Sequence, residues 1–330
     1  MQADPAVLSP ETASPADVPL VAATSDAAGS VFAQTWWLDA AAPGAWHRNE
    51  ITWGGRPVGS MSFSVRHRAG LRFIQMPPLT RSLSPVLNPP GGSPVHLLLN
   101  RVRILEELLG KLPKHDRFEI GLQPGCDSAL PFVMLNYPVA QTYTFTAPEA
   151  GELRARMHQK TRNIVNKAAR DFHVVVADDP DRFLHLLRTQ RGAGLQEDVD
   201  TVRRLYEAAH SRRQATVLRA VNQRSQDGGC AILVWDAQRL YFWLSARDPA
   251  ESSNGALSIL ITEAAQQAAA MGRVFDMDGW GTRRSGTFLA KFGFLPVVRG
   301  YVNHGSARWK LLHCLSSAWR GLRDDRHYRF

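Results

Sequence analysis

The order in which apolar periodicities change along the chain is the feature that most restricts its fold. Residues 46–78 alternate apolar and polar side chains around turn glycines, which predicts an antiparallel meander. Residues 95–112 then carry apolar side chains at helical spacing, and residues 116–124 and 132–148 return to strand patterns, with one or two strands expected in the last range. This order is typical of an α+β unit with one core.

The second half of the chain shows a related order of elements. Residues 149–172 predict one strongly basic helix, three strand patterns lie within residues 215–248, and residues 254–272 predict an apolar helix. We therefore expect two α+β units packed side by side, over residues 31–147 and 148–307.

The two ends of the chain differ from these units. Residues 1–30 are rich in Pro, Ala, Ser and Thr and lack both a basic start and a long apolar run. We interpret them as a disordered leader rather than a signal peptide. Residues 308–330 hold six Arg or Lys and two Asp, and apolar side chains share one helical face. This basic amphipathic tail fits contact with the inner-membrane surface, or a helix packed on the body with a frayed end.

Charge and cysteine content narrow the partners and the compartment. With 39 basic and 30 acidic residues the net charge is +9, which favours phosphates, nucleic acid or an anionic membrane face. Cys126, Cys230 and Cys314 are isolated, so neither a disulfide framework nor a zinc site is expected. No apolar run is long enough to span a bilayer. We expect a cytoplasmic protein, with peripheral membrane contact as the alternative.

Residues 275–294, "FDMDGWGTRRSGTFLAKFGF", join a strand pattern to a short helix through a glycine-rich loop. Gly279, Gly281 and the basic pair Arg283 and Arg284 are compatible with a phosphate loop. The segment lacks the G-x-x-x-x-G-K-[ST] pattern, however, so an ordinary strand-to-helix connection is the competing interpretation.

Several segments together resemble the Fem-type, double-GNAT branch of the GNAT acyltransferase superfamily. They include "FAQTWWLDAAAPGAW", "MPPLTRSLSP", "MHQKTRNIVNKAAR", "NGALSILITEAAQQAAAMG" and the stretch just described, and the likeness covers about residues 31–305. The resemblance implies an α+β fold of two tandem GNAT-like domains with a cleft between them. It also implies an N-acyltransferase.

The donor that this resemblance implies is acyl-CoA, whose pyrophosphate would bind at a helix N-terminus. That helix would begin near residue 254, and an ordinary cap of a buried helix is the alternative explanation of this segment. The donor-binding candidates are Ser252, Ser253, Asn254, Gly255 and Ala256. The helical-hairpin insertion common in Fem-type enzymes that use aminoacyl-tRNA is not seen, which favours acyl-CoA, and no metal is expected.

Acyl transfer needs a group that accepts a proton from the amine and one that returns a proton to the leaving group. Leu289 occupies the position at which many GNAT enzymes carry a tyrosine that acts as the general acid. Lys291 is a possible substitute, and Asp276, Tyr241 and Tyr301 are further acid or base groups. We prefer Asp278 because it lies nearest the loop. The catalytic candidates are Asp278, Lys291 and Tyr301.

The basic helix supplies candidates for binding the acceptor. Four of its polar side chains form one helical stripe, and the resemblance implies that this helix lines the cleft. A solvated charged face is the alternative. The substrate-binding candidates are Arg156, Lys160, Arg162, Asn163, Lys167, Trp280, Arg283 and Arg284.

These observations favour transfer of an acyl group to an amino group on an envelope sugar, peptide or related metabolite. The expected acceptor is anionic, such as a nucleotide- or lipid-linked saccharide. One alternative is an aminoacyl-tRNA-dependent transferase of peptidoglycan precursors, the one case in which nucleic acid is an expected partner. The other is a catalytically silent GNAT-fold binding protein, which Leu289 keeps open.

Overall fold

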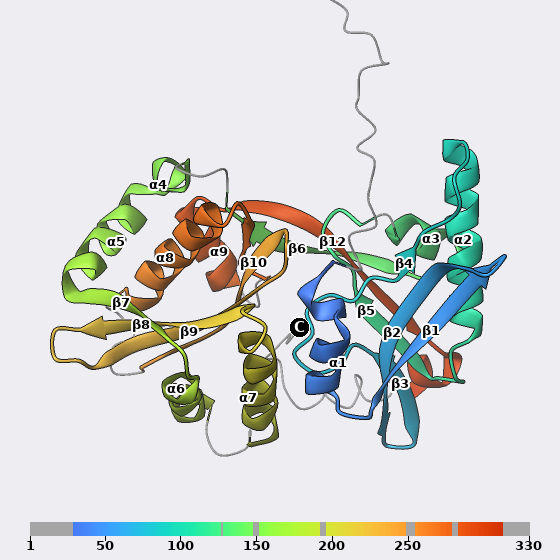
Figure 1. The fold of residues 1–330 in the computed structure, drawn as a ribbon, viewed down its shortest axis with the longest axis horizontal. Helices are drawn as coiled ribbons and strands as arrows, with labels where there is room; N and C mark the ends of the chain where they lie inside the picture. Colours follow the sequence, from blue (N-terminus) through green and yellow to red (C-terminus); the bar gives the residue numbers. More distant parts are fainter. Residues whose placement is uncertain are drawn as a thin grey trace, which may run out of the picture.

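A computed structural model describes residues 29–126, 128–147, 152–191, 196–248, 255–278 and 283–312. The described strands form one mixed sheet of 12 strands that runs through the whole molecule (Figure 1). Its order is β1-β2-β3-β5-β12-β6-β11-β10-β9-β8-β7, with β4 paired to β2. No described helix is both long and apolar enough to cross a membrane.

The N-terminal half contains the predicted meander, formed by β1 (Trp46–Trp53), β2 (Arg56–Arg68) and β3 (Leu71–Gln75). The short β4 (Val86–Leu87) pairs with β2, and β5 (Arg117–Gly121) runs parallel to β3. The apolar side of α2 (Pro94–Gly110) packs on this sheet through Ile104, Leu105 and Leu108.

Residues 129–134 form the helix α3 (Ala129–Met134), where the sequence suggested strand. Pro131 sits in its first turn, a position that proline tolerates, and Phe132 is buried against Phe118. The strand β6 (Val139–Thr146) begins only after Pro138. Residues 132–148 therefore supply one strand, not two.

The C-terminal half is a sheet that helices cover on both faces. Its strands are β7 (Phe172–Ala177), β8 (Ala215–Asn222), β9 (Asp227–Trp235), β10 (Arg239–Arg247) and β11 (Val274–Asp276). One face packs on α6 (Asp181–Arg191) and α7 (Gln196–His210), and the other on α5 (Gln159–Asp171), α8 (Ala256–Ala270) and α9 (Arg283–Phe292). Val217 faces the first core and Leu218 the second. Burial on both faces explains the unbroken apolar runs of these strands.

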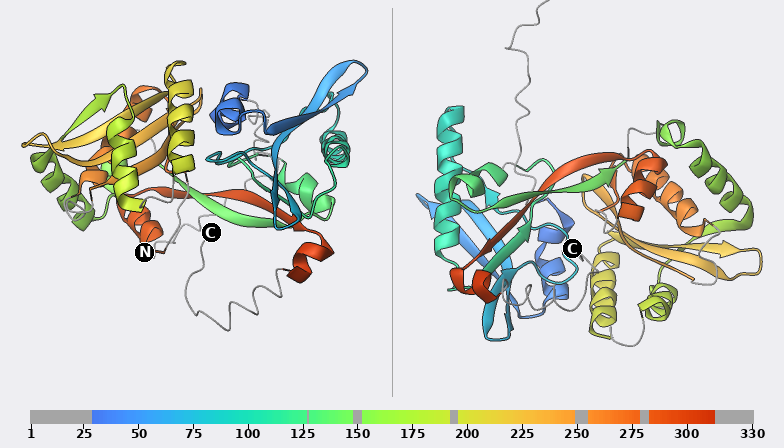
Figure 2. Two further views of the ribbon diagram at one scale, coloured as in Figure 1. Left: turned by 90° about the horizontal axis from the view of Figure 1, so that it is seen from below. Right: turned by 180° about the vertical axis from the view of Figure 1, so that it is seen from behind.

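Two long strands connect the halves. The last strand, β12 (Leu295–Gly305), pairs antiparallel with β5 of the N-terminal half and with β6. Figure 2 shows β6 and β12 running side by side from one half to the other. The sheet of the first half is therefore completed by residues from the end of the chain.

The start of the described chain also crosses between the halves. The 3₁₀ turn at Val31–Ala33 and α1 (Thr35–Ala41) lie in the same core as α6, α7 and β10. The rings of Phe32 and Tyr241 are 4.9 Å apart, and those of Trp37 and Trp243 are 5.2 Å apart. The division of the chain after residue 147 stays a prediction, and these contacts show that it would not separate two self-contained cores.

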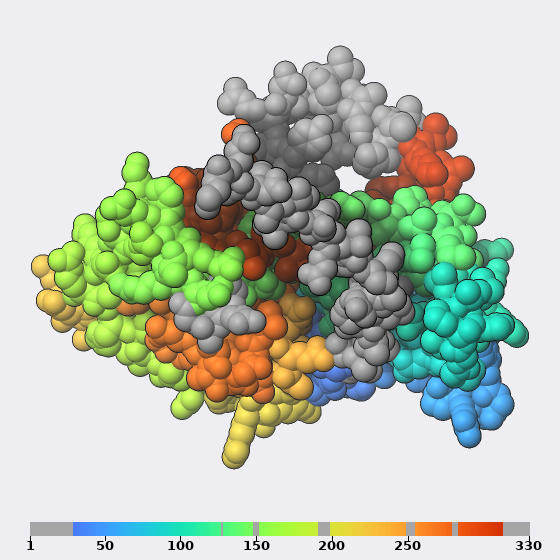
Figure 3. Space-filling view, turned by 90° about the horizontal axis from the view of Figure 1, so that it is seen from above, coloured from blue at the N-terminus to red at the C-terminus, as the bar shows by residue number. Residues whose placement is uncertain are grey.

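The basic segment forms two helices rather than the one that we expected, α4 (Glu152–Arg156) and α5. The chain turns at His158, whose backbone N–H donates to the Lys291 carbonyl at 2.9 Å and whose side chain caps α5. α5 packs on α8 and on the edge strand β7. In the space-filling view, α4 and α5 (light green) form the margin of the molecule remote from α2 (Figure 3). α5 thus packs on the C-terminal half, and the expectation that the basic helix lines a cleft between the halves stays a prediction.

Candidate active site

Asp278 lies in a turn immediately after β11, at the middle of the sheet. Its φ of +56° is left-handed, a conformation that Asp tolerates better than most residues. The turn is fixed by Asp276, whose Oδ1 accepts the Asp278 N–H at 2.8 Å. The Met277 N–H donates to the Phe145 carbonyl at 2.8 Å, so β6 holds the same turn from the other side.

The Asp278 carboxylate is buried beside two arginines. Its Oδ2 lies 2.7 Å from Arg81 Nε, and its Oδ1 lies 3.7 Å from Arg299 Nη1, while its side chain is 3% exposed. Oδ2 receives no hydrogen bond of ordinary geometry from the described residues. Burial raises the pKa of Asp278 to about 7, and the charge of Asp276 adds to this effect. The two arginines oppose the shift, but desolvation outweighs them.

Asp276 is equally buried, but its oxygens are occupied. Thr144 donates its hydroxyl to Oδ1, and Arg239 Nη1 donates to Oδ2 at 3.1 Å. With the Asp278 N–H these bonds engage both carboxylate oxygens. Asp276 therefore fixes the turn, whereas Oδ2 of Asp278 receives no hydrogen bond of ordinary geometry from the described residues.

The two central strands diverge beside this carboxylate. β10 and β11 pair in parallel from Arg239 and Val274 as far as Tyr241 and Asp276, and β10 then continues to Arg247 without a partner on that side among the described strands. The loop 76–85 enters there. Arg81 Nη2 donates to the Trp243 carbonyl at 3.0 Å, and Trp243 Nε1 donates to the Leu79 carbonyl at 3.1 Å. Arg81 of the N-terminal half thus contacts Asp278 of the C-terminal half.

Tyr301 lies farther along β12, two residues beyond Arg299. Its hydroxyl donates to Glu119 Oε2 at 3.2 Å, and Glu119 also pairs with Arg117 at 2.7 Å. Burial raises the pKa of Tyr301 to about 12, helped by the charge and the hydrogen bond of Glu119. No contact among the described residues joins Tyr301 to Asp278. Tyr301 is therefore a weak proton donor, and its catalytic role stays a prediction.

Lys291 has an exposed side chain on α9, and no described contact links it to Asp278. Leu289 is 4% exposed and packs in the same core as Phe292 and Phe294. The position at which a tyrosine was expected therefore faces the core of this chain. Tyr241 is 4% exposed, and burial raises its pKa well above 10.

The donor-binding candidates lie at the N-terminus of α8, but Ser252, Ser253 and Asn254 fall outside the described residues. Gly255 is the N-terminal cap residue, with a left-handed φ of +84°. A Cβ there would lie 3.0 Å from Ile164 Cγ2 and 3.1 Å from Ala168 Cβ, so α5 packs closely on this end of α8. Ala256 is buried. The close approach of α5 explains the small residues at both positions.

The basic candidates do not converge on Asp278. Arg156 pairs with Glu152 at 2.8 Å, and Arg162 Nη1 donates to the Ala155 carbonyl at 3.4 Å. The other candidates on α5 have exposed side chains: Lys160, Asn163 and Lys167. Arg283 and Arg284 are exposed in the first turn of α9, and Trp280 lies outside the described residues. Their roles in acceptor binding stay predictions.

Sequence reasoning missed Arg81 and Arg299, the two cations beside Asp278. Arg81 stands in the "MPPLTRSLSP" segment that contributed to the family resemblance, whereas Arg299 looks like any polar residue of a strand. No regular spacing connects these positions along the chain. Only the pairing of β12 with β6 and the entry of the loop 76–85 bring them together.

Comparisons with known proteins agree with this architecture. Residues 152–284 match the family model of the acetyltransferase (GNAT) domain. The crystal structure of FemX is similar, with a TM-score of 0.62 and 12% identity over 87% of this chain and 94% of that one. L-PGS from Bacillus licheniformis is also similar, with a TM-score of 0.51 and 11% identity over 84% of this chain and 89% of that one. No curated protein sequence matches the chain.

A third solved structure is the C-terminal domain of a putative lysylphosphatidylglycerol synthetase from Agrobacterium fabrum. It gives a TM-score of 0.51 and 12% identity over 87% of this chain and 94% of that one. At identities this low, the structural similarity establishes the fold and nothing further. The chain has the Fem-type, double-GNAT fold, which confirms the predicted α+β class and the two tandem GNAT-like units.

Proposed function

We propose that this protein, which has the Fem-type double-GNAT fold, is an N-acyltransferase that uses Asp278 as its general base. The domain match and the fold support acyl or aminoacyl transfer in general. The observation that carries the finer proposal is a buried carboxylate with a pKa of about 7 at the point where β10 and β11 diverge. A base with this pKa can take up a proton at neutral pH and give it back.

The reaction begins when the acceptor amine attacks the acyl carbonyl carbon. A C–N bond forms, the C–S bond to CoA breaks, and Asp278 takes one proton from the amine nitrogen. The departing thiolate receives a proton, for which Tyr301 and Lys291 are the candidate donors. Arg81 and Arg299 hold the Asp278 carboxylate in place and keep its pKa from rising further.

The proposed donor is acyl-CoA, which would supply the activated acyl group. Its pyrophosphate would lie at the N-terminus of α8, which begins after the left-handed Gly255. Its acyl end would lie beside Asp278, where β10 and β11 diverge and the loop 76–85 enters. The proposed acceptor is an anionic, amine-bearing envelope sugar, peptide or related metabolite, with Arg283 and Arg284 at its approach.

Aminoacyl transfer from tRNA is the second candidate. The structural neighbours favour it, since one is FemX and another belongs to an enzyme named for a lysyl-containing product. The net charge of +9 also suits an RNA partner. A catalytically silent binding protein is the third candidate.

Thermal-shift titration with acetyl-CoA, CoA and bulk aminoacyl-tRNA separates the three candidates. We expect acetyl-CoA and CoA to raise the melting temperature, because a ligand that binds only the folded state stabilises it. A shift with tRNA alone would move the donor to aminoacyl-tRNA. No shift with any of the three would leave the silent binding protein as the remaining candidate.

A further inference from the structure

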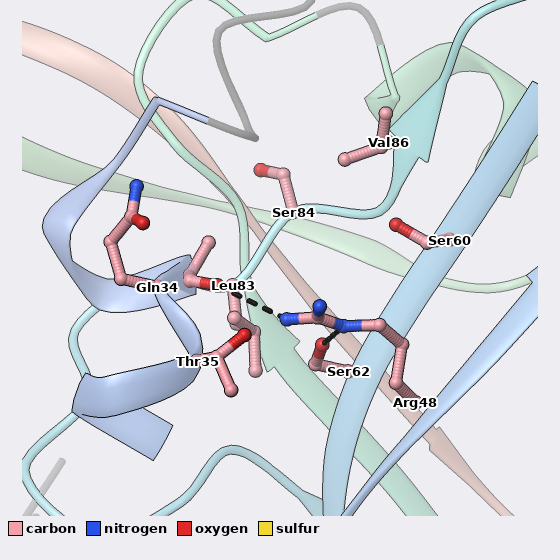
Figure 4. A pocket seen from close by; sticks show the side chains of 9 residues that line it. Gln34, Thr35, Arg48, Ser60, Ser62, Leu83, Ser84 and Val86 are labelled. Atoms are coloured by element: carbon pink, nitrogen blue, oxygen red, sulfur yellow. Dashed lines mark hydrogen bonds between the residues drawn. The ribbon is translucent and has the colours of Figure 1, made fainter. Parts of the chain in front are cut away.

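A row of serines lines one face of β2. Ser60, Ser62 and Ser64 alternate with Met61 and Phe63, which belong to the apolar core on the opposite face. Ser62 and Ser64 are 8% and 6% exposed. Small hydroxyl groups on a largely covered sheet face leave space, and the structure has a cavity of about 170 Å³ there. It lies between β1, β2, α1 and the segment 83–86 (Figure 4).

Arg48 is the charged side chain of this cavity. It stands opposite Ser62 across the β1–β2 pair, where its Nε donates to Ser62 Oγ at 2.9 Å and its Nη2 donates to the Ala33 carbonyl at 3.3 Å. The guanidinium also lies 5.2 Å from the centre of the Trp46 ring. Within the described chain it forms no ion pair. Glu50, two residues along the same strand face, lies outside ion-pair distance. Three neutral contacts therefore orient the exposed Arg48 guanidinium, and no described carboxylate pairs with it; Asp39 accepts the Trp46 Nε1–H at 2.7 Å instead.

The other polar groups of the cavity can add hydrogen bonds to an anion. Figure 4 shows Arg48, Ser60, Ser62 and Ser84 around one hollow, with Thr35 at its α1 side. Ser84 is fixed by the Gln123 N–H, which donates to its Oγ at 2.8 Å. A cation held among hydroxyl donors is the chemistry that recognises phosphate and carboxylate groups. The volume is below the roughly 300–1,000 Å³ of ordinary ligand pockets, so it suits one anionic group of a larger molecule.

The cavity is tied to the proposed active site by one short segment. Leu83 and Ser84 line the cavity, and Arg81, just before them, contacts Asp278. Three residues of extended chain span at most about 10 Å. One short segment therefore joins the wall of the cavity to the arginine beside Asp278, with Ser82 and Leu83 buried between them.

We infer that the Arg48 cavity is an anion subsite, which holds a phosphate or carboxylate group of the acceptor while its amine reaches Asp278. The acceptor assignment rests on the proposed function. The anion site itself does not, because it follows from the cavity and its charge.

The test is isothermal titration calorimetry of the full chain with inorganic phosphate and, separately, with acetate, at constant ionic strength. We expect one of the two to bind saturably, and the better ligand identifies the group. Arg48→Ala is expected to weaken binding about tenfold or more, equivalent to about 1.4 kcal/mol. Ser62→Ala is expected to weaken it less, because Arg48 keeps its charge. Arg66→Ala, which removes an exposed arginine from the neighbouring strand β2, is the matched control and should change nothing.

A CoA titration separates this subsite from the donor site. CoA affinity should be the same in Arg48→Ala as in the wild type, whereas an equal loss for CoA would overturn the acceptor assignment. Saturable binding of neither anion, or binding that survives in Arg48→Ala, would overturn the subsite. Failure of the proposed function would instead appear as absent acetyl-CoA binding with intact phosphate or acetate binding, so the two failures can be told apart.

Discussion

Asp278 is a carboxylate that the fold buries between two arginines, next to a second carboxylate. As the general base it must be ionised to act. We expect kcat/KM for acyl transfer to rise with pH through about 7 and then level off. Asp278→Asn should lower kcat by about 10²- to 10⁴-fold, the usual contribution of a positioned base. A pH–rate series measures both, and an unchanged profile in the variant would exclude this role.

The same group makes stability depend on pH. Its pKa is about 7 in the folded protein and about 3.9 in an unfolded chain, so the folded state holds the extra proton between these values. The contribution of Asp278 to the free energy of unfolding of the wild type is therefore lost as pH rises from about 4 to about 7. The free energy of unfolding of Asp278→Asn, relative to wild type, should increase with pH across that window. Urea titrations of both proteins at three pH values test this, and a difference that does not change with pH would contradict it.

Arg81 opposes the rise in the pKa of Asp278 by its positive charge. Replacing it with methionine removes that charge, so the midpoint of the pH–rate profile should move to higher pH. Arg81→Lys keeps the charge and should move the midpoint less, although it loses the planar donor set that contacts Trp243. A midpoint that falls in Arg81→Met would contradict the arrangement of charges around Asp278.

At the scale of elements, the N-terminus of α8 depends on one glycine. Gly255 has φ +84°, and a Cβ there would lie only 3.0 Å from Ile164 Cγ2 and 3.1 Å from Ala168 Cβ of α5. Gly255→Ala should lower the free energy of unfolding by about 1–2 kcal/mol for the backbone alone, with a further loss from displacing α5. Chemical denaturation measures the change. Gly91→Ala is the control, because a Cβ at Gly91 meets nothing within 4 Å. If CoA binds at this helix end, its affinity should fall in Gly255→Ala but not in Gly91→Ala.

Side-chain periodicity in the sequence predicted some of the helices and strands and not others. The meander, the long helix α2 and the strands β8 to β10 were predictable, because their side-chain periods report which faces are buried. The basic helix was predicted as one element and is two. Its break at His158 is made by a hydrogen bond to Lys291, more than 130 residues away in the chain. No local period contains that information.

At the scale of the whole molecule, β12 and residues 31–41 tie the halves together. A fragment of residues 29–147 would lack β12, leaving β5 and β6 without the strand that lies between them. We expect this fragment to be unfolded or aggregated alone, and the full chain to unfold in one cooperative transition. Circular dichroism and calorimetry of both test this. A stably folded fragment would show that the halves are independent domains.

The sequence by itself determined the fold class, the order of the elements and the preference for Asp278, because burial periods and turn residues are local properties of the chain. Only the tertiary structure decided which cations surround that carboxylate and where the basic helix lies. It also gathered Arg48 and the serines of β2 beside the segment that carries Arg81. The physical reason is that desolvation and charge depend on three-dimensional neighbours. The neighbours of Asp278 come from a loop almost two hundred residues earlier and a strand twenty residues later.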